Sequence, residues 1–236
     1  MSRQAEQPST LRIDDVPTVR SMVAQKLRNA IMSGTFKPGQ RLVERELCEM
    51  TGVSRPSIRE ALRLLEADGL VRTIPHRGPV VSTISLEEAR QLYAARAVLE
   101  GFAGRECARV NDPAIVRRIG DALVKLKAAT AASDFVATLE AKTEFYAAII
   151  TGCRNTFIER MLRPLHDRIT LLRITSMSQP KRINTSMREV TAIWRAIQSG
   201  DPDLAERCCV DHVKAAAVAA LAMIEQSSAE AEKPPA

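Results

Sequence analysis

The fold of the N-terminal part is decided by residues 44–71, which read ERELCEMTGVSRPSIREALRLLEADGLV. Two helical stretches are separated here by a turn at Gly52, a residue that readily adopts the left-handed backbone that ends a helix. Ser54 is a typical helix N-cap, and Pro56 stands in the first turn, where its missing N–H costs nothing. The second helix has an apolar side at helical spacing, formed by Ile58, Leu62 and Leu65. The stretch predicts a helix-turn-helix.

The flanking sequence completes a small domain. Apolar residues at spacings of three and four predict an amphipathic helix from Val16 to Ser33, which ends at Gly34. Behind the motif, residues 70–73 and 79–82 are typical of two strands joined by a turn at 75–78. Three helices and a hairpin predict a winged helix-turn-helix domain over residues 16–84.

The remainder of the chain is predicted to be helical, with breaks at Gly, Pro, Asn and Asp residues. We expect six antiparallel helices, at about 85–110, 113–131, 134–152, 155–177, 182–199 and 201–225. The fold class is therefore mainly α, a winged helix-turn-helix followed by a six-helix bundle over 85–225. Residues 1–15 are expected to form a flexible N-terminus. Residues 226–236 are expected to form a disordered tail, because they are polar and end in KPPA.

Composition supports this reading. The 236 residues are 45% hydrophobic and 26% charged, which excludes a wholly disordered or fibrous chain, and only 3% are aromatic, which favours helices over a sandwich or barrel. Five cysteines without a CxxC pair suggest reduced thiols rather than a disulfide framework or a zinc ribbon. The chain has no apolar run of about 18 residues and no apolar leader, so we expect a cytoplasmic protein.

Basic charge is concentrated near the N-terminus. Residues 1–84 contain 13 Lys/Arg against 9 Asp/Glu, and residues 85–236 contain 21 against 19. Within the second helix of the motif, Arg55, Arg59 and Arg63 are four residues apart, so they share one exposed side. Such a helix fits the DNA major groove, where arginine donates two hydrogen bonds to guanine. A row of basic residues taken alone is as often a solvent-exposed face as a DNA-binding one. The surrounding winged-helix pattern favours DNA binding.

Other residues of this domain are expected to assist. The first-turn amides of the helix, together with Ser54 and Ser57, are suited to hold a phosphate. Arg45 on the preceding helix would reach the DNA backbone or a base. The hairpin tip is narrow enough for the minor groove, and it carries a donor and a cation in His76-Arg77-Gly78.

A family resemblance rests on LVEREL at 42–47, GVSRPSIREAL at 52–62 and LEADGLV at 65–71. These motifs resemble the GntR family of bacterial transcription regulators. The helical part, with LYAARAVLE at 92–100 and Asp211-His212, is similar to the FCD effector domain of the FadR subfamily. The resemblance covers about residues 15–225. It implies DNA contacts from Arg45, Arg55, Arg59 and the 76–78 tip, and a homodimer on a palindromic operator.

The helical part also carries polar side chains on apolar stripes. Arg96, Lys142 and His212 occupy positions where a core residue is expected, and Tyr146 lies one turn after Lys142. Buried cations need a carboxylate partner, a water-filled cavity or an anionic ligand, and Glu100 is one possible partner for Arg96. An internal salt bridge with a satisfied core histidine is therefore one interpretation. The preferred interpretation is a cavity for a small carboxylate, with Arg168 as a further contributor.

The resemblance also implies a metal site, which this sequence does not reproduce. Many relatives hold a metal with one Asp and three His, and the matching positions here are Lys142, Tyr146, Val190 and His212. Only the last is a ligand, and an ammonium group repels a divalent cation. We therefore expect no metal and no other cofactor.

These residues are consistent with three functions. The preferred one is a ligand-responsive transcription regulator, a repressor that a small carboxylate releases from DNA. An effector-independent structural DNA-binding protein is the first alternative. An enzyme that uses Lys142 is the second, and it is disfavoured because no nucleotide loop, catalytic triad or metal-ligand set accompanies the lysine.

Overall fold

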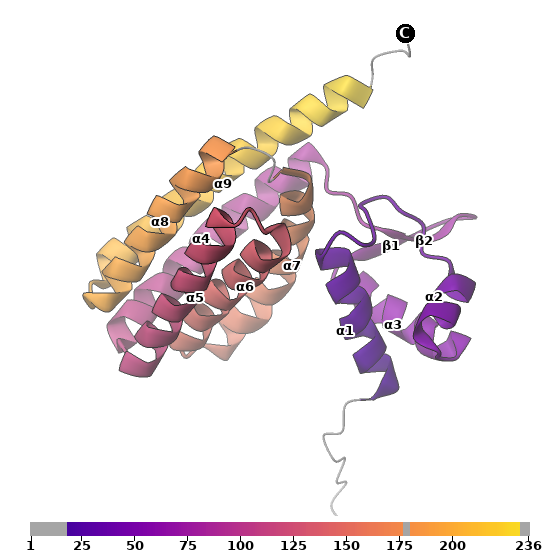
Figure 1. The fold of residues 1–236 in the computed structure, drawn as a ribbon, viewed down its shortest axis with the longest axis horizontal. Coiled ribbons are helices and arrows are strands. Elements are labelled where there is room, and N and C mark those ends of the chain that lie inside the picture. Colours follow the sequence, from indigo (N-terminus) through magenta and orange to yellow (C-terminus); the bar gives the residue numbers. More distant parts are fainter. Residues whose placement is uncertain (1–17, 177–179, 232–236) are drawn as a thin grey trace, which may run out of the picture.

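The computed structural model describes residues 18–176 and 180–231, which form a small N-terminal lobe and a larger helical bundle (Figure 1). The small lobe consists of α1 (Val19–Met32), α2 (Glu44–Thr51), α3 (Arg55–Ala67), β1 (Val71–Ile74) and β2 (Gly78–Val81). The bundle consists of α4 (Leu86–Val110), α5 (Pro113–Ala131), α6 (Phe135–Gly152), α7 (Thr156–Ser176), α8 (Pro180–Gln198) and α9 (Pro202–Ala231). The predicted fold class, a winged helix-turn-helix followed by six helices, is confirmed.

The helices of the small lobe end and pack as predicted from the sequence. Gly52 ends α2 with a φ of 71°, and its N–H donates to the carbonyl of Cys48 at 2.9 Å. The apolar side of α3 packs into a core with α1 and the loop before α2, which turns the opposite side of α3 to solvent. The residues of this core that are 0% exposed are Ile31, Ile58, Ala61, Leu65, Leu70 and Val81.

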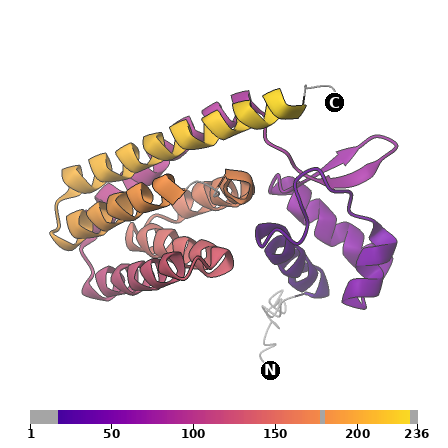
Figure 2. The ribbon, with the colours of Figure 1, turned by 45° about the horizontal axis from the view of Figure 1, so that its top comes forward.

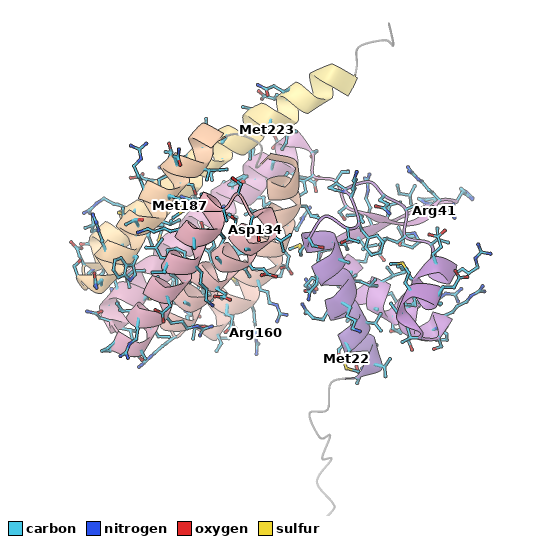
Figure 3. All side chains as sticks on the ribbon, in the orientation of Figure 1. Met22, Arg41, Asp134, Arg160, Met187 and Met223 are labelled. Carbon is cyan, nitrogen blue, oxygen red and sulfur yellow. The ribbon has the colours of Figure 1, made fainter. Side chains whose placement is uncertain are left out.

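The two strands lie one residue away from their predicted positions. β1 and β2 pair antiparallel, with Val71 opposite Val81 and Ile74 opposite Gly78. Leu70 was expected to begin the first strand, but its N–H donates to the carbonyl of Leu65 at 2.9 Å, which makes it part of the turn that ends α3. Arg41, labelled in Figure 3, lies beside the hairpin, where its backbone forms a bridge to Val80.

The bundle is built on capped helices. Ser85 and Glu88 form a reciprocal capping box at the start of α4, and Asp112 and Asp134 cap α5 and α6. α9 lies along α4, with α8 beside it, and α5, α6 and α7 complete the bundle (Figure 2). The apolar core runs between these helices, and its largest fully buried apolar side chain is that of Phe145.

The predicted C-terminal tail begins too early. α9 continues to Ala231, so residues 226–231 are helical rather than part of a disordered tail. These residues contain no Gly or Pro, and Ala, Gln and Glu are good helix formers, so nothing in them ends the helix. Residues 232–236 and the predicted flexible N-terminus at 1–15 lie outside the described part of the chain.

α7 is a helix of the bundle that packs against the small lobe. Arg28 of α1 forms ion pairs with Asp68, the C-cap of α3, and with Asp167 of α7. Leu171 of α7 is buried in the core of the small lobe. A shift of α7 would therefore displace α1 and the end of α3.

Among the described helices, none is long and apolar enough to cross a membrane.

Candidate functional site

The first candidate site is the exposed side of α3. Because Ile58, Leu62 and Leu65 face the core, Arg59 and Arg63 point outward, with 60% and 74% of their side chains exposed. Arg55 is also exposed. The predicted orientation of the basic row is confirmed, whereas its contact with DNA stays a prediction.

The arginines of this surface have different neighbours. Nε of Arg59 donates to Oε1 and Oε2 of Glu44 at 2.9 and 3.0 Å, and Glu44 belongs to α2. Arg63 instead bonds to Glu60 of its own helix at 2.7 Å. Arg45 on α2 is exposed and lies 3.8 Å from Glu49, one turn along. The sequence analysis found the arginines but not the connection between α2 and α3.

The start of α3 and the hairpin tip complete this surface. Ser54 is the N-cap of α3, but its hydroxyl lies 3.1 Å from the Ser57 hydroxyl and makes no capping bond to a backbone amide. The first-turn amides are thus suited to hold a phosphate oxygen. His76 stands at the tip of the hairpin with a φ of 61°, followed by exposed Arg77 and by Gly78 with a φ of 83°. Their DNA contacts likewise stay predictions.

The second candidate site is a group of buried polar residues inside the bundle. Arg96 is 0% exposed and Glu100 is 5% exposed. Nε and Nη2 of Arg96 donate to the two carboxylate oxygens of Glu100 at 2.5 and 3.2 Å, which confirms Glu100 as the partner of Arg96. His166 of α7 lies with its Nε2 2.6 Å from the same carboxylate.

The electrostatics of this pair are dominated by burial and by the partner charge. Burial is the largest single effect on each pKa and disfavours the charged form, but the partner charge together with the other nearby charges and hydrogen bonds outweighs it. The pKa of Glu100 is therefore held well below its usual range by Arg96 and His166. The pKa of Arg96 is raised by Glu100. Both groups are ionised in the folded protein.

A hydrogen-bonded chain lies next to this pair. Nδ1 of His212 is 2.6 Å from Oε2 of Glu189, and its Nε2 is 2.6 Å from the Tyr146 hydroxyl. Burial lowers the pKa of His212 to about 4, and the charges of Arg96 and Lys142 act in the same direction. The imidazole is thus neutral at pH 7, so Nδ1–H donates to Glu189 and Nε2 accepts from Tyr146.

Two cations adjoin this chain. Arg182 donates to both oxygens of Glu189 at 2.8 and 2.9 Å. Nζ of Lys142 donates to the Ser186 hydroxyl at 3.3 Å, and the Lys142 side chain is half-buried. The guanidinium of Arg96 lies 5.3 Å from the centre of the Tyr146 ring, so the two buried groups are in contact. We call these residues the buried polar cluster: Arg96, Glu100, Lys142, Tyr146, His166, Arg182, Ser186, Glu189 and His212.

A cleft between the lobes reaches the edge of this cluster. It has a volume of ≈ 810 Å³ and is lined by α1, α6 and α7. Tyr146 and His166 belong both to the buried polar cluster and to the lining of the cleft, and Arg28 and Asp167 line it on the side of the small lobe. The cluster is therefore adjacent to the contact between the lobes.

Comparison with known proteins assigns both lobes. Residues 19–81 match the family model of bacterial regulatory proteins of the gntR family, and residues 91–215 match the model of the FCD domain. The chain belongs to the GntR family. It is a transcription regulator of that family, with a DNA-binding lobe and an FCD effector-binding domain.

Individual relatives agree with this assignment. The chain is 27% identical to a probable D-xylose utilization operon transcriptional repressor of Paenarthrobacter nicotinovorans, over 84% of this chain and 87% of the relative. It is also 27% identical to the Glc operon transcriptional activator of Escherichia coli strain K12, over 85% and 88%. A crystal structure of a GntR regulator from Rhodococcus sp. RHA1 matches with a TM-score of 0.75 and 28% identity, covering 86% of this chain and 97% of that one.

The residues at the metal-binding positions of this family do not fit a divalent cation. Lys142 brings a positive charge, Val190 is fully buried and has no donor atom, and Tyr146 is hydrogen-bonded to His212. Within residues 18–176 and 180–231, no three His, Cys, Asp or Glu side chains are grouped so as to hold a metal ion. The absence of a metal in the protein stays a prediction.

One predicted ligand residue is misplaced. Arg168 was assigned to the ligand site, but Nη2 donates to Glu88 of α4 at 2.9 Å, and its side chain packs over Gly69 at the end of α3. It belongs to the contact between the lobes, because the helical phase of α7 directs it away from the bundle interior. The helical pattern of α7 alone did not determine this direction.

Four members of the buried polar cluster were not predicted from the sequence: His166, Arg182, Ser186 and Glu189. Ser186 is 4% exposed and lies one turn before Val190 on the buried side of α8. His166 follows Leu162 and precedes Ile169 on the buried side of α7, so the same search for polar residues on apolar stripes would have found it. Glu189 and Arg182 lie at the edge of the bundle, with about a fifth of each side chain exposed. Nothing in the pattern of α8 distinguishes them from surface charges.

Proposed function

We propose that the protein is a cytoplasmic, homodimeric repressor that binds a palindromic operator and is released by a small carboxylate bound at the buried polar cluster. It acts by binding and catalyses no reaction. The observation that carries this proposal is that ionised groups at the centre of the FCD domain lie next to the helix that pairs with the DNA-binding lobe.

The DNA-binding half of the proposal is supported by the surface of the small lobe. α3 presents Arg55 and Arg59 to solvent, and the hairpin carries Arg77 at its tip. Two copies related by a two-fold axis would read two half-sites, which is why a palindromic operator is expected. The relatives include a probable repressor and an activator at equal identity, so the gel-shift titration below tests the direction of regulation.

The chemistry of the buried polar cluster supports an anionic effector. In the described part of the chain it contains three basic side chains, Arg96, Lys142 and Arg182, and two carboxylates, Glu100 and Glu189. One added carboxylate would bring the sum of the charges of these five side chains to zero. The ligand would be held by Lys142, which lies at the half-buried side of the cluster, with hydrogen bonds from neighbouring hydroxyls.

Two consecutive residues of α7 provide a route from ligand to DNA. His166 bonds to Glu100 inside the bundle, and Asp167 pairs with Arg28 on α1. A ligand that moves Glu100 or Tyr146 would change the position of α7 and hence the orientation of the small lobe. The ligand regulates only if it binds the two orientations with different affinity.

A panel of small carboxylic acids tests the effector in a thermal-shift assay. A ligand at 100 times its Kd stabilises the fold by about 2.7 kcal/mol. We expect a stabilising acid to release the protein from its own upstream DNA in a gel-shift titration. Lys142→Met should abolish the stabilisation, whereas Lys127→Met, which removes an exposed lysine of α5, should not. Stronger DNA binding with the acid would contradict release.

The internal pairing of Arg96 with Glu100 favours one alternative, an effector-independent structural DNA-binding protein. In that case the buried polar cluster would only stabilise the bundle. The two functions differ in one measurement: the structural protein would show neither a stabilising acid nor a preference for its own upstream DNA over random DNA at moderate salt.

A further inference from the structure

Arg59 differs from the other arginines of the DNA-binding surface because a residue of another helix holds it. Glu44 is the first residue of α2, and its carboxylate accepts two hydrogen bonds from Nε of Arg59, fifteen residues further along. Within residues 18–176 and 180–231, Arg45 and Arg63 pair with Glu49 and Glu60 of their own helices. Glu44 is therefore placed to determine the direction of one arginine relative to both helices of the motif.

The bond uses one particular edge of the guanidinium. Both hydrogen bonds to Glu44 come from Nε, so the terminal edge formed by Nη1 and Nη2 takes no part in them. A guanidinium has five N–H donors in a fixed plane, so fixing Nε also fixes the direction of the remaining four. Two parallel donors on one edge are the pattern that the O6 and N7 acceptors of guanine accept in the major groove.

The charge of Glu44 also favours contact between Arg59 and a base. A carboxylate beside Arg59 reduces its attraction to phosphate oxygens, which carry the same sign of charge as Glu44. The pKa of Arg59 is raised by its hydrogen bond to Glu44, so the arginine remains charged. The pair therefore favours a base edge over the DNA backbone as the partner of Arg59.

We propose that Glu44 is a positioning residue for base recognition: it holds Nε of Arg59 so that the terminal edge of the guanidinium faces a guanine of the operator half-site. Glu44 itself does not touch DNA. This inference rests on the proposed operator recognition, because without a preferred sequence there is no base for Arg59 to read.

The test starts with selection of preferred sequences from a random duplex library by the full-length protein. The selected duplex and variants with each guanine changed to adenine are then titrated by fluorescence anisotropy. Glu44→Gln keeps the shape of the side chain and removes its charge. We expect it to lower the discrimination against one guanine change by about five- to ten-fold, part of what a bidentate arginine–guanine pair provides. Affinity for random DNA should stay the same or rise.

Two further variants make the result specific. Glu46→Gln removes the same charge from the first turn of α2 at an exposed position, and it should leave discrimination unchanged. Arg59→Lys lacks the planar edge, so it should lose discrimination at the same guanine, and adding Glu44→Gln to it should cause no further loss. An unchanged thermal midpoint in Glu44→Gln excludes unfolding as the cause.

The outcomes distinguish a failure of operator recognition from a failure of the role of Glu44. If wild-type protein enriches no sequence, the proposed operator recognition is wrong and this inference is wrong with it. If wild-type protein selects a sequence and Arg59→Lys relaxes it while Glu44→Gln does not, operator recognition holds and the role of Glu44 is refuted. A uniform loss of affinity for all duplexes in Glu44→Gln also refutes positioning, because a positioning residue alters the ratio of affinities.

Discussion

Replacing Glu100 by glutamine tests whether the ion pair inside the FCD domain is as buried as its geometry indicates. The change leaves the charge of Arg96, which is 0% exposed, without its carboxylate and alters the bond to His166. Breaking a buried pair by removing one partner costs about 3–5 kcal/mol. Because the glutamine oxygen still accepts one hydrogen bond, we expect a loss of about 3 kcal/mol, a large share of the roughly 5–15 kcal/mol that stabilises a domain.

Urea unfolding followed by tryptophan fluorescence is the appropriate assay. Trp194 is the only tryptophan in the sequence, and it joins α8 to α5 through a 3.2 Å hydrogen bond from Nε1 to the carbonyl of Val116, so it reports on the bundle. Glu87→Gln on the same helix is the control. Glu87 is exposed, so its replacement should lower the free energy of unfolding by about 0–0.5 kcal/mol. A midpoint for Glu100→Gln no lower than that of the control would refute the buried pair.

The pH dependence of stability independently tests whether the pKa of Glu100 is lowered in the folded protein. The folded-state pKa of Glu100 lies below its unfolded value of about 4.3, so the unfolded state binds the proton more readily. The stabilisation is fully present above about pH 4.3 and is lost as the pH falls toward the depressed pKa. Glu100→Gln should therefore show a smaller loss of stability on acidification than wild type, and an equal loss would contradict the assignment.

Stability measurements also test the burial of His212, the ion pairs of Arg28 and the close packing at Gly152. The His212 ring should titrate in NMR near its lowered pKa of about 4, so stability should fall as pH drops from 6.5 toward 4; a midpoint near 6.5 would refute its burial. Arg28→Ala should cost about 2 kcal/mol and speed hydrogen exchange in α1, because it removes the ion pairs to the end of α3 and to α7, whereas exposed Lys26→Ala should change neither. Gly152→Ala should cost about 1–3 kcal/mol in urea unfolding, because its Cβ would lie 2.5 Å from Sγ of Cys107; wild-type stability would show that the helices separate easily.

The order and type of the helices and strands follow from local signals in the sequence. Gly52, Gly69 and Pro56 mark helix ends through their own backbone preferences, and the apolar spacing of α3 determines which side carries the arginines. These signals act over a few residues, so no tertiary contact is needed to interpret them. The buried position of Arg96 and its partner one turn away were predictable for the same reason, since residues four apart meet on a helix.

Contacts between side chains that are distant in the sequence depend on how the helices pack. The hydrogen bond from Tyr146 to His212 spans 66 residues and that from Arg59 to Glu44 spans 15, and both depend on how two helices are rotated against each other. The same rotation places Arg168 against the small lobe rather than in the bundle. Helix rotation is set by the packing of the whole core, where every side chain must fit at close-packed density, and no local stretch of sequence contains that information.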